Sequence, residues 1–175
     1  GAVSCVGIND VDASQHVVSQ LADEGRKRIA LINHDLSYKY ARLRERGYKS
    51  VIHLRDLDYQ AVEYASELSS SAGMAAMQNL LTANPPDAVF AVSDTLAAGA
   101  LRAIQQAGLR VPEDIAVVGF DGTELAEMIS LTTIEQPSRD IGRKAVNLLL
   151  NKIDNPDAPT ERVMMDWRFI SRASP

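Results

Sequence analysis

Short apolar segments alternate with amphipathic helical segments along the chain, and this alternation limits the possible folds more than any other feature. The clearest apolar runs are residues 29–32, 88–92 and 115–120, which contain no polar side chain. Unbroken runs of this kind are typical of strands that are covered on both faces. Between them, residues 72–81 and 94–107 repeat apolar side chains at helical spacing. Buried strands separated by helices indicate βαβ units, so we expect an α/β fold built on parallel sheets.

The rest of the chain continues this alternation. Further strands are expected at 4–8, 62–64, 131–134 and 162–170, and further helices at 13–24, 38–51 and 138–153. Gly25, Gly108 and the Pro85–Pro86 pair follow predicted helices, where such residues commonly end them. Residues 155–160 (NPDAPT) have the composition of a surface loop.

Charge and cysteine content restrict the functions that this chain can have by itself. The net charge is −5, whereas a duplex-binding surface needs clustered lysine and arginine. The densest basic cluster holds Arg42, Arg44, Arg46 and Lys49, and we interpret it as one helix face. Cys5 is the single cysteine, is expected in the core of its strand, and permits no internal disulfide. We therefore expect a cytoplasmic protein, and the apolar runs are too short to span a membrane.

Polar side chains follow five of the predicted strands. They are Asn9 and Asp10 after the first strand, Asn33, His34 and Asp35 after the second, Ser93 and Asp94 after residues 88–92, Asp121 after residues 115–120, and Gln136 after residues 131–134. Ligands of open parallel sheets bind beyond the carboxyl ends of the strands. Hydrogen-bonding groups gathered there predict a site for a polyhydroxylated small molecule.

The same positions also serve ordinary structural needs, so two interpretations stay open. Asp94 is well placed to cap the helix that follows it. Asp121 precedes Gly122, a pair typical of turns, so a turn role and a ligand role are both possible.

No set of catalytic or metal-binding residues emerges from the sequence. His16, His34 and His53 lack metal-ligand spacing. The chain has neither a phosphate-binding loop nor a G-x-G-x-x-G motif, and residues 69–71 (SSS) lack the pattern of a nucleophile elbow. We expect a protein that is not an enzyme and that uses no cofactor and no metal.

Seven stretches of the chain together resemble one known family. They are 20–29 (QLADEGRKRI), 44–48 (RERGY), 86–99 (PDAVFAVSDTLAAG), 108–121 (GLRVPEDIAVVGFD), 131–137 (LTTIEQP), 141–150 (IGRKAVNLLL) and 169–174 (FISRAS). In this order and at this spacing they resemble the lactose-repressor (LacI/GalR-type) family of transcription regulators. The resemblance covers essentially the whole chain, but only the later half of a complete family member.

The resemblance implies two α/β lobes of the periplasmic-binding-protein type, with an effector in the cleft between them. Residues 1–26 and 131–158 would belong to the lobe nearer the DNA-binding head, and residues 27–130 and 159–175 to the far lobe. The helix-turn-helix, the hinge helix and the first part of the near lobe have no counterpart in the sequence. We therefore expect an incomplete near lobe with an uncovered sheet edge and exposed apolar surface.

The resemblance also assigns roles to three polar residues of the far lobe. Arg44 matches the arginine that clamps the effector, and its planar fork suits vicinal hydroxyls or an anion. Without the resemblance, Arg44 would be interpreted as a surface arginine. Asp121 matches the aspartate that accepts hydrogen bonds from effector hydroxyl or amine groups. Ser93 matches a polar position beside the ligand, whereas Asp94 is expected to be structural.

Five further positions match the lining of the effector site. Tyr38 and Tyr40 would offer aromatic faces to a sugar ring, with simple packing as the alternative for Tyr40. Leu68 falls where many relatives place an aromatic stacking residue. Asn9 and Gln136 match near-lobe positions that line the cleft.

Some positions depart from the family pattern and leave the effector unidentified. Ile8 stands where many relatives have aspartate, and Gly122 stands where asparagine is common. Leu68 offers no ring. The segment from Asp121 to Leu131 is shorter than in relatives.

By this resemblance, the chain is the effector-binding and dimerisation domain of a bacterial transcription repressor. The effector would be a sugar or sugar derivative, and operator DNA would be bound only through the absent head. A homodimer is expected, with residues 94–107 and the segment after Asp121 as candidate interface. A periplasmic sugar-binding protein of a transport system is the alternative. The interpretation requires Arg44, Ser93 and Asp121 to converge at one crevice.

Overall fold

A computed structural model describes residues 3–175; Gly1 and Ala2, which open the predicted near-lobe segment, lie outside the described residues. The chain divides into two compact units, each described separately. The small unit comprises the chain up to Asn9 together with Gln136–Arg168. The large unit comprises Asp10–Glu135 and Phe169–Pro175.

These units have different boundaries from the predicted lobes. Residues 10–26 were expected beside residues 1–9, but helix α1 (Asp10–Asp23) belongs to the large unit. It buries Val17, Val18 and Leu21 and packs so closely on the next helix that a Cβ at Gly47 would lie 2.6 Å from the carbonyl oxygen of Val11. Residues 131–135 also belong to the large unit, because Thr132–Glu135 form a strand of its sheet.

The large unit is built on a six-stranded sheet with the order β3-β2-β4-β5-β6-β8. The strands are β2 (Ile29–Asn33), β3 (Ala61–Tyr64), β4 (Ala88–Ala91), β5 (Ala116–Asp121), β6 (Thr132–Glu135) and β8 (Arg168–Ile170). The pairs β2–β3, β2–β4, β4–β5 and β5–β6 are all parallel. Every residue of β2 and β4 is buried. The predicted α/β fold with a parallel sheet is confirmed.

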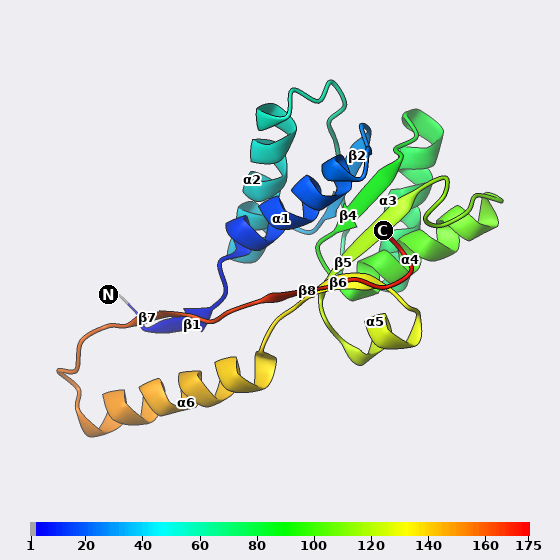
Figure 1. The fold of residues 1–175 in the computed structure, drawn as a ribbon. Coiled ribbons are helices and arrows are strands. Elements are labelled where there is room, and N and C mark those ends of the chain that lie inside the picture. Colours follow the sequence, from blue (N-terminus) through cyan, green and yellow to red (C-terminus); the bar gives the residue numbers. More distant parts are fainter. Residues whose placement is uncertain (1–2) are drawn as a thin grey trace. The chain divides into compact units, whose positions relative to one another are not determined.

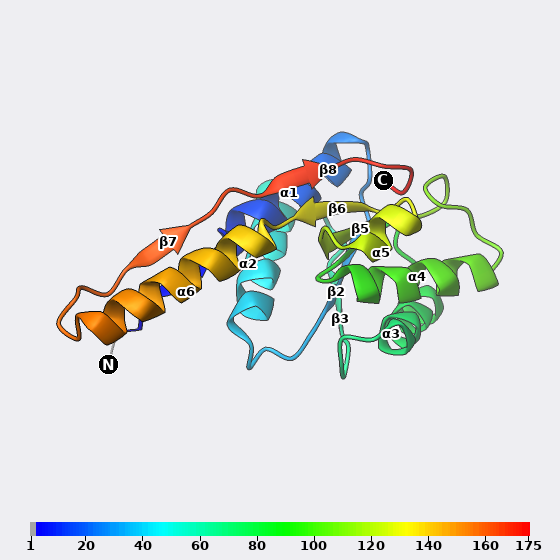
Figure 2. The same cartoon turned by 90° about the horizontal axis from the view of Figure 1, so that it is seen from below.

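Helices cover both faces of this sheet. The remaining helices of the large unit are α2 (Lys39–Leu54), α3 (Ser70–Ala83), α4 (Asp94–Gln106) and α5 (Glu124–Met128). Figures 1 and 2 show α1 and α2 together on one face and α3 and α4 together on the other. The short helix α5 was not predicted.

The small unit contains a two-stranded parallel sheet and one long helix. Strand β1 (Cys5–Gly7) pairs with β7 (Arg162–Met164), and α6 (Ser138–Asp154) packs against β1. Residues 162–170 were predicted as one strand but form two, β7 and β8. The ladder with β1 ends with the hydrogen bond from the Met165 N–H to the carbonyl oxygen of Gly7, and residues 168–170 join the other sheet.

Apolar side chains in the small unit remain exposed. Helix α6 buries none of its residues, and Val146, Leu149, Leu150 and Ile153 are all more than half exposed. The exposed apolar surface expected from the sequence is therefore present. Cys5 is exposed as well, so its predicted place in a core is wrong: β1 has one strand partner and one helix against it. No helix within residues 3–175 combines the length and apolar composition needed to cross a membrane.

Candidate functional site

Side chains from two strand ends and from α2 gather at the carboxyl edge of the large sheet, where open parallel sheets bind ligands. His34 follows β2, and Asp121 ends β5. Tyr40 and Arg44 lie one turn apart in α2, and Tyr38 is the residue directly before this helix. We call His34, Tyr38, Tyr40, Arg44 and Asp121 the rim cluster.

Arg44 is the buried centre of this cluster. Its Nε donates to Oδ1 of Asp10 at 2.8 Å, and its Nη1 donates to the carbonyl oxygen of Val92 at 2.6 Å. The guanidinium carbon lies 3.5 Å from the centroid of the Phe120 ring. Nη1 is also 3.9 Å from Oδ1 of Asp121.

Two sequence-based interpretations of Arg44 are therefore wrong. Its side chain is 6% exposed, so it is not a surface arginine. It also lies on a different face of the helix from Arg42, Arg46 and Lys49, because those three side chains are exposed. Within residues 3–175, Nη2 donates no hydrogen bond, so one edge of the guanidinium remains available for a further acceptor.

Three stacked rings stand beside Arg44. His34 stacks on Tyr38 with centroids 5.0 Å apart, and on Tyr40 with centroids 6.3 Å apart. The hydroxyl of Tyr40 is 2.8 Å from Nδ1 of His34. Burial raises the pKa of Tyr40; Arg44 opposes this effect, while Asp121 adds to it. Tyr40 is thus fixed within the cluster, whereas Tyr38 is half exposed.

Asp121 combines a turn conformation with a position facing Arg44. Its backbone has φ of 123°, a region that non-glycine residues rarely adopt. Gly122 follows with φ of 72° and lies so close to Glu135 that a Cβ would be 2.6 Å from the Glu135 Cα. The Asp121 side chain is 38% exposed. Both positive φ angles lie where the chain leaves β5, as a glycine-containing pair allows.

Ser93 takes the capping role that was expected of Asp94. Ser93, not Asp94, caps α4: its Oγ accepts from the backbone N–H of Leu96 at 3.1 Å. Asp94 is fully buried and accepts from the backbone N–H of Thr123 at 2.7 Å, from Thr123 Oγ1 at 2.8 Å and from Thr133 Oγ1 at 2.6 Å. Because Ser93 directly follows Val92, it adjoins the carbonyl that holds Arg44. Asp94 therefore makes the structural contacts that the resemblance implied.

A buried polar network below the rim was missed by sequence reasoning. The amide of Asn33 donates to the carbonyl oxygen of Ala41 at 3.1 Å and to Glu45 at 3.0 Å, and its Oδ1 accepts from the N–H of His34. Glu45 also accepts from the Tyr64 hydroxyl and from Lys49 at 2.6 Å. The network ties α2 to the end of β2. Asn33 had been noted after its strand, but nothing local marked Glu45.

This network makes the stability of the large unit depend on pH. Burial alone would raise the pKa of Glu45, but hydrogen bonds from Lys49, Asn33 and Tyr64 outweigh it and hold the pKa below its ordinary 4.5. A carboxyl group whose pKa is lower in the folded protein stabilises the fold at every pH above its pKa in the unfolded chain. This stabilisation is lost as the pH falls through the pKa of the folded protein.

We therefore expect Glu45→Gln to lower the free energy of unfolding by about 1–2 kcal/mol at pH 7. The difference from the wild type should shrink below about pH 4.5, as measured by urea denaturation at several pH values. The exposed Glu113→Gln is the control. A Glu45→Gln deficit that stays constant down to pH 3 would contradict the assignment.

Three predicted site residues, Leu68, Asn9 and Gln136, are not members of the rim cluster. Leu68 lies between β3 and α3 and is 46% exposed. Asn9 and Gln136 belong to the small unit.

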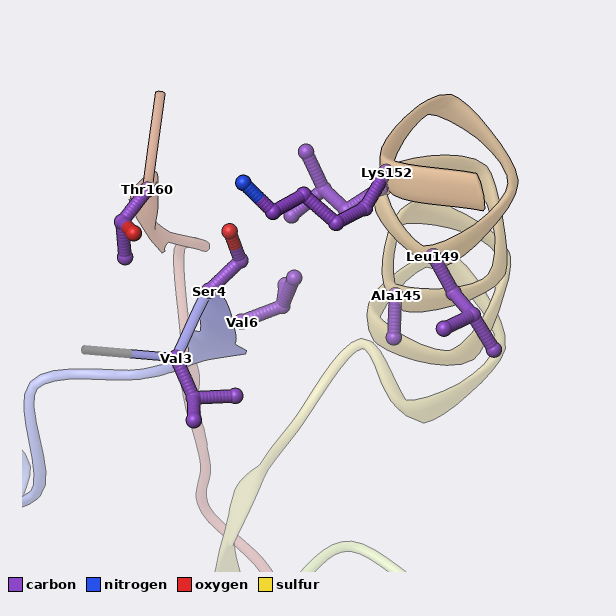
Figure 3. A pocket seen from close by; sticks show the side chains of 8 residues that line it. Val3, Ser4, Val6, Ala145, Leu149, Lys152 and Thr160 are labelled. Carbon is purple, nitrogen blue, oxygen red and sulfur yellow. The ribbon is translucent and has the colours of Figure 1, made fainter. Parts of the chain in front are cut away.

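A separate pocket of about 300 Å³ lies in the small unit between β1 and α6 (Figure 3). Val3, Val6 and Leu149 supply much of its apolar lining, and the Lys152 side chain extends from α6 toward Ser4. A sugar site needs several convergent polar groups, so this pocket is a weaker candidate than the rim cluster. Within the described part of the chain, no group of three or more His, Cys, Asp or Glu side chains could hold a metal ion.

Comparison with known proteins gives consistent matches. The family model of the periplasmic binding protein-like domain matches residues 18–175. The ribose operon repressor of Haemophilus influenzae is 37% identical over 160 residues, which cover 88% of this chain and 48% of the repressor. The chain thus spans about half the length of the curated relatives that it matches.

Solved structures agree with this assignment. An uncharacterized protein from Actinobacillus succinogenes superposes with a TM-score of 0.96 at 49% identity, covering 99% of this chain and 65% of that one. A LacI family transcriptional regulator from Enterococcus faecium, solved with bound ribose, superposes with a TM-score of 0.90 at 28% identity, covering 98% and 65%. The chain therefore belongs to the periplasmic binding protein-like domain family, and it corresponds to the effector-binding region of LacI-family transcriptional regulators.

Proposed function

We propose that this chain is the effector-binding part of a bacterial transcription repressor and that the rim cluster binds a small, sugar-like effector. One observation carries the proposal: the buried Arg44 is fixed by Asp10 and Val92 and retains one nitrogen without a hydrogen-bond acceptor, beside the accessible carboxylate of Asp121. A hydroxyl group both donates and accepts hydrogen bonds. Neighbouring hydroxyls of a sugar would accept from Arg44 and donate to Asp121.

Aromatic rings and neighbouring polar groups complete such a site. The faces of Tyr38 and Tyr40 suit the apolar face of a sugar ring. We assign Ser93, Leu68, Asn9 and Gln136 as further lining residues. The ribose bound to the Enterococcus faecium regulator supports a sugar as the ligand class.

The effector would act by shifting populations between two arrangements of the protein. It must bind one arrangement better than the other, and a coupling of about 1–3 kcal/mol is typical. Operator DNA would be bound through a helix-turn-helix outside this chain, in a cytoplasmic homodimer with α4 and the segment after Asp121 at its interface. The match to curated repressors favours this function over a periplasmic transport protein.

The site is tested by thermal shift of the full-length protein against sugars and purines. A ligand at 100 times its dissociation constant should stabilise the protein by about 2.7 kcal/mol. Arg44→Ala and Asp121→Ala should each weaken binding by about 100-fold, because charge-assisted hydrogen bonds are lost from a largely buried site. Arg46→Ala, an exposed arginine of the same helix, is the matched control. A ligand that binds both variants as tightly as the wild type would refute the assigned site.

We further propose that the chain binds its effector without converting it. A turnover assay on sugars, sugar phosphates and nucleosides checks this, and consumption of any of them would contradict it.

A further inference from the structure

The guanidinium of Arg44 already has two anionic neighbours. Two carboxylates face this one buried guanidinium: Asp10 at 2.8 Å and Asp121 at 3.9 Å. The nearest arginine on the same helix does not compensate, because Arg42 turns away and donates to the carbonyl oxygens of Leu36 and Ser37 at 2.6 and 2.7 Å. Two carboxylates therefore offset the single positive charge of Arg44.

Asp10 is the closer of the two carboxylates. It is the first residue of α1, and its side chain is 15% exposed while it is paired with Arg44. By occupying Nε it fixes the orientation of the guanidinium, and it supplies a full negative charge in a partly desolvated place. An isolated buried arginine would attract an anion, whereas an arginine already shared by two carboxylates offers a hydrogen bond without a net positive charge.

We propose that Asp10 makes the rim cluster selective for uncharged, hydroxyl-bearing effectors and against phosphorylated or carboxylated ones. This inference rests on the proposed function and narrows it from sugars and their derivatives to neutral sugars. A phosphate or carboxylate placed on Arg44 meets the like charges of Asp10 and Asp121, and repulsion between like charges in a partly buried site is strong. Asp10 acts through Arg44 and is a positioning and specificity residue.

The test compares neutral sugars with charged partners of the same shape. Isothermal titration calorimetry of the full-length protein uses D-ribose, D-glucose and D-galactose, and the matching ribose 5-phosphate, glucose 6-phosphate and galacturonate. We expect the charged partner of any bound sugar to bind at least about 100-fold more weakly. Asp10→Asn keeps a hydrogen-bond acceptor for Arg44 but loses the charge. In this variant the ratio of the dissociation constants of the charged and the neutral sugar should fall about tenfold.

Asp23→Asn is the matched control. It removes the same charge from the same helix and also breaks an arginine pair of 2.8 Å, with Arg55, but at the opposite end of α1. Its affinity ratio should equal that of the wild type. A merely structural role of Asp10 would change the affinities for neutral and charged sugars together and leave their ratio unchanged, which overturns the inference.

The two proposals fail in different ways. If a charged sugar binds as tightly as its neutral partner, the charge selectivity is wrong and the sugar-binding function stands. If no sugar of either kind binds, the proposed function is wrong and the selectivity falls with it.

Discussion

Gly99→Ala should destabilise the large unit by at least about 3 kcal/mol, although glycine to alanine inside a helix normally stabilises by up to about 1 kcal/mol. Gly99 lies within α4 where this helix crosses α3. A Cβ added there would lie 2.6 Å from the backbone nitrogen of Met74 and would overlap the carbonyl oxygen of Ser70. Both neighbours are backbone atoms of a packed helix, so neither can move without separating α3 from α4.

Gly142→Ala is the control with the opposite expected sign. Gly142 is an interior residue of α6, and a Cβ there would meet no atom within 4 Å. Alanine should therefore stabilise that helix by about 0.5–1 kcal/mol. Urea denaturation followed by far-UV circular dichroism measures both changes. Destabilisation of less than about 1 kcal/mol by Gly99→Ala would show that α3 and α4 are not packed this closely.

The order of elements could be predicted from the sequence because burial leaves a direct pattern. Strands β2, β4 and β5 are covered on both faces, so they had to be continuous apolar runs. Helix α5 was missed because its five residues are too few to show a helical period. The cap of α4 was assigned to Asp94 instead of Ser93, since both residue types cap helices and a shift of one residue leaves the apolar pattern unchanged.

The site could be predicted only in part, because its contacts join distant segments. Arg44 sits in a run of charged residues typical of a helix surface, and only the family resemblance marked it as a ligand residue. Its partner Asp10 is 34 residues away, and no local spacing predicts that pair. Arg44, Ser93 and Asp121 were expected to converge. Arg44 lies 3.9 Å from Asp121 and donates to the carbonyl oxygen of Val92, whereas the side chain of the next residue, Ser93, caps α4. The burial of Glu45 could not be predicted from the sequence, since its polar partners come from β2, α2 and β3.

Asp94→Ala should lower the free energy of unfolding of the large unit by about 3 kcal/mol, and it should also weaken effector binding. The fully buried carboxylate accepts three hydrogen bonds, two from Thr123 and one from Thr133. Alanine would leave these donors unpaired in the interior, where each unpaired group costs about 1–3 kcal/mol, partly offset because no charge is buried any longer. The same bonds hold the turn after β5, so the backbone of Asp121 should loosen and effector affinity should fall together with stability.

Far-UV circular dichroism in urea is the suitable probe, because the single tryptophan, Trp167, lies in the small unit and would report on the wrong part of the chain. Asp114→Ala is the matched control: its carboxylate pairs with Arg110 at the surface, so its loss should lower the free energy of unfolding far less than the loss of the Asp94 carboxylate. Asp94→Asn separates the two contributions, since the amide oxygen can still accept from Thr123 while the charge is gone. If Asp94→Ala proves no more destabilising than Asp114→Ala, the three hydrogen bonds do not hold the turn that presents Asp121 to Arg44.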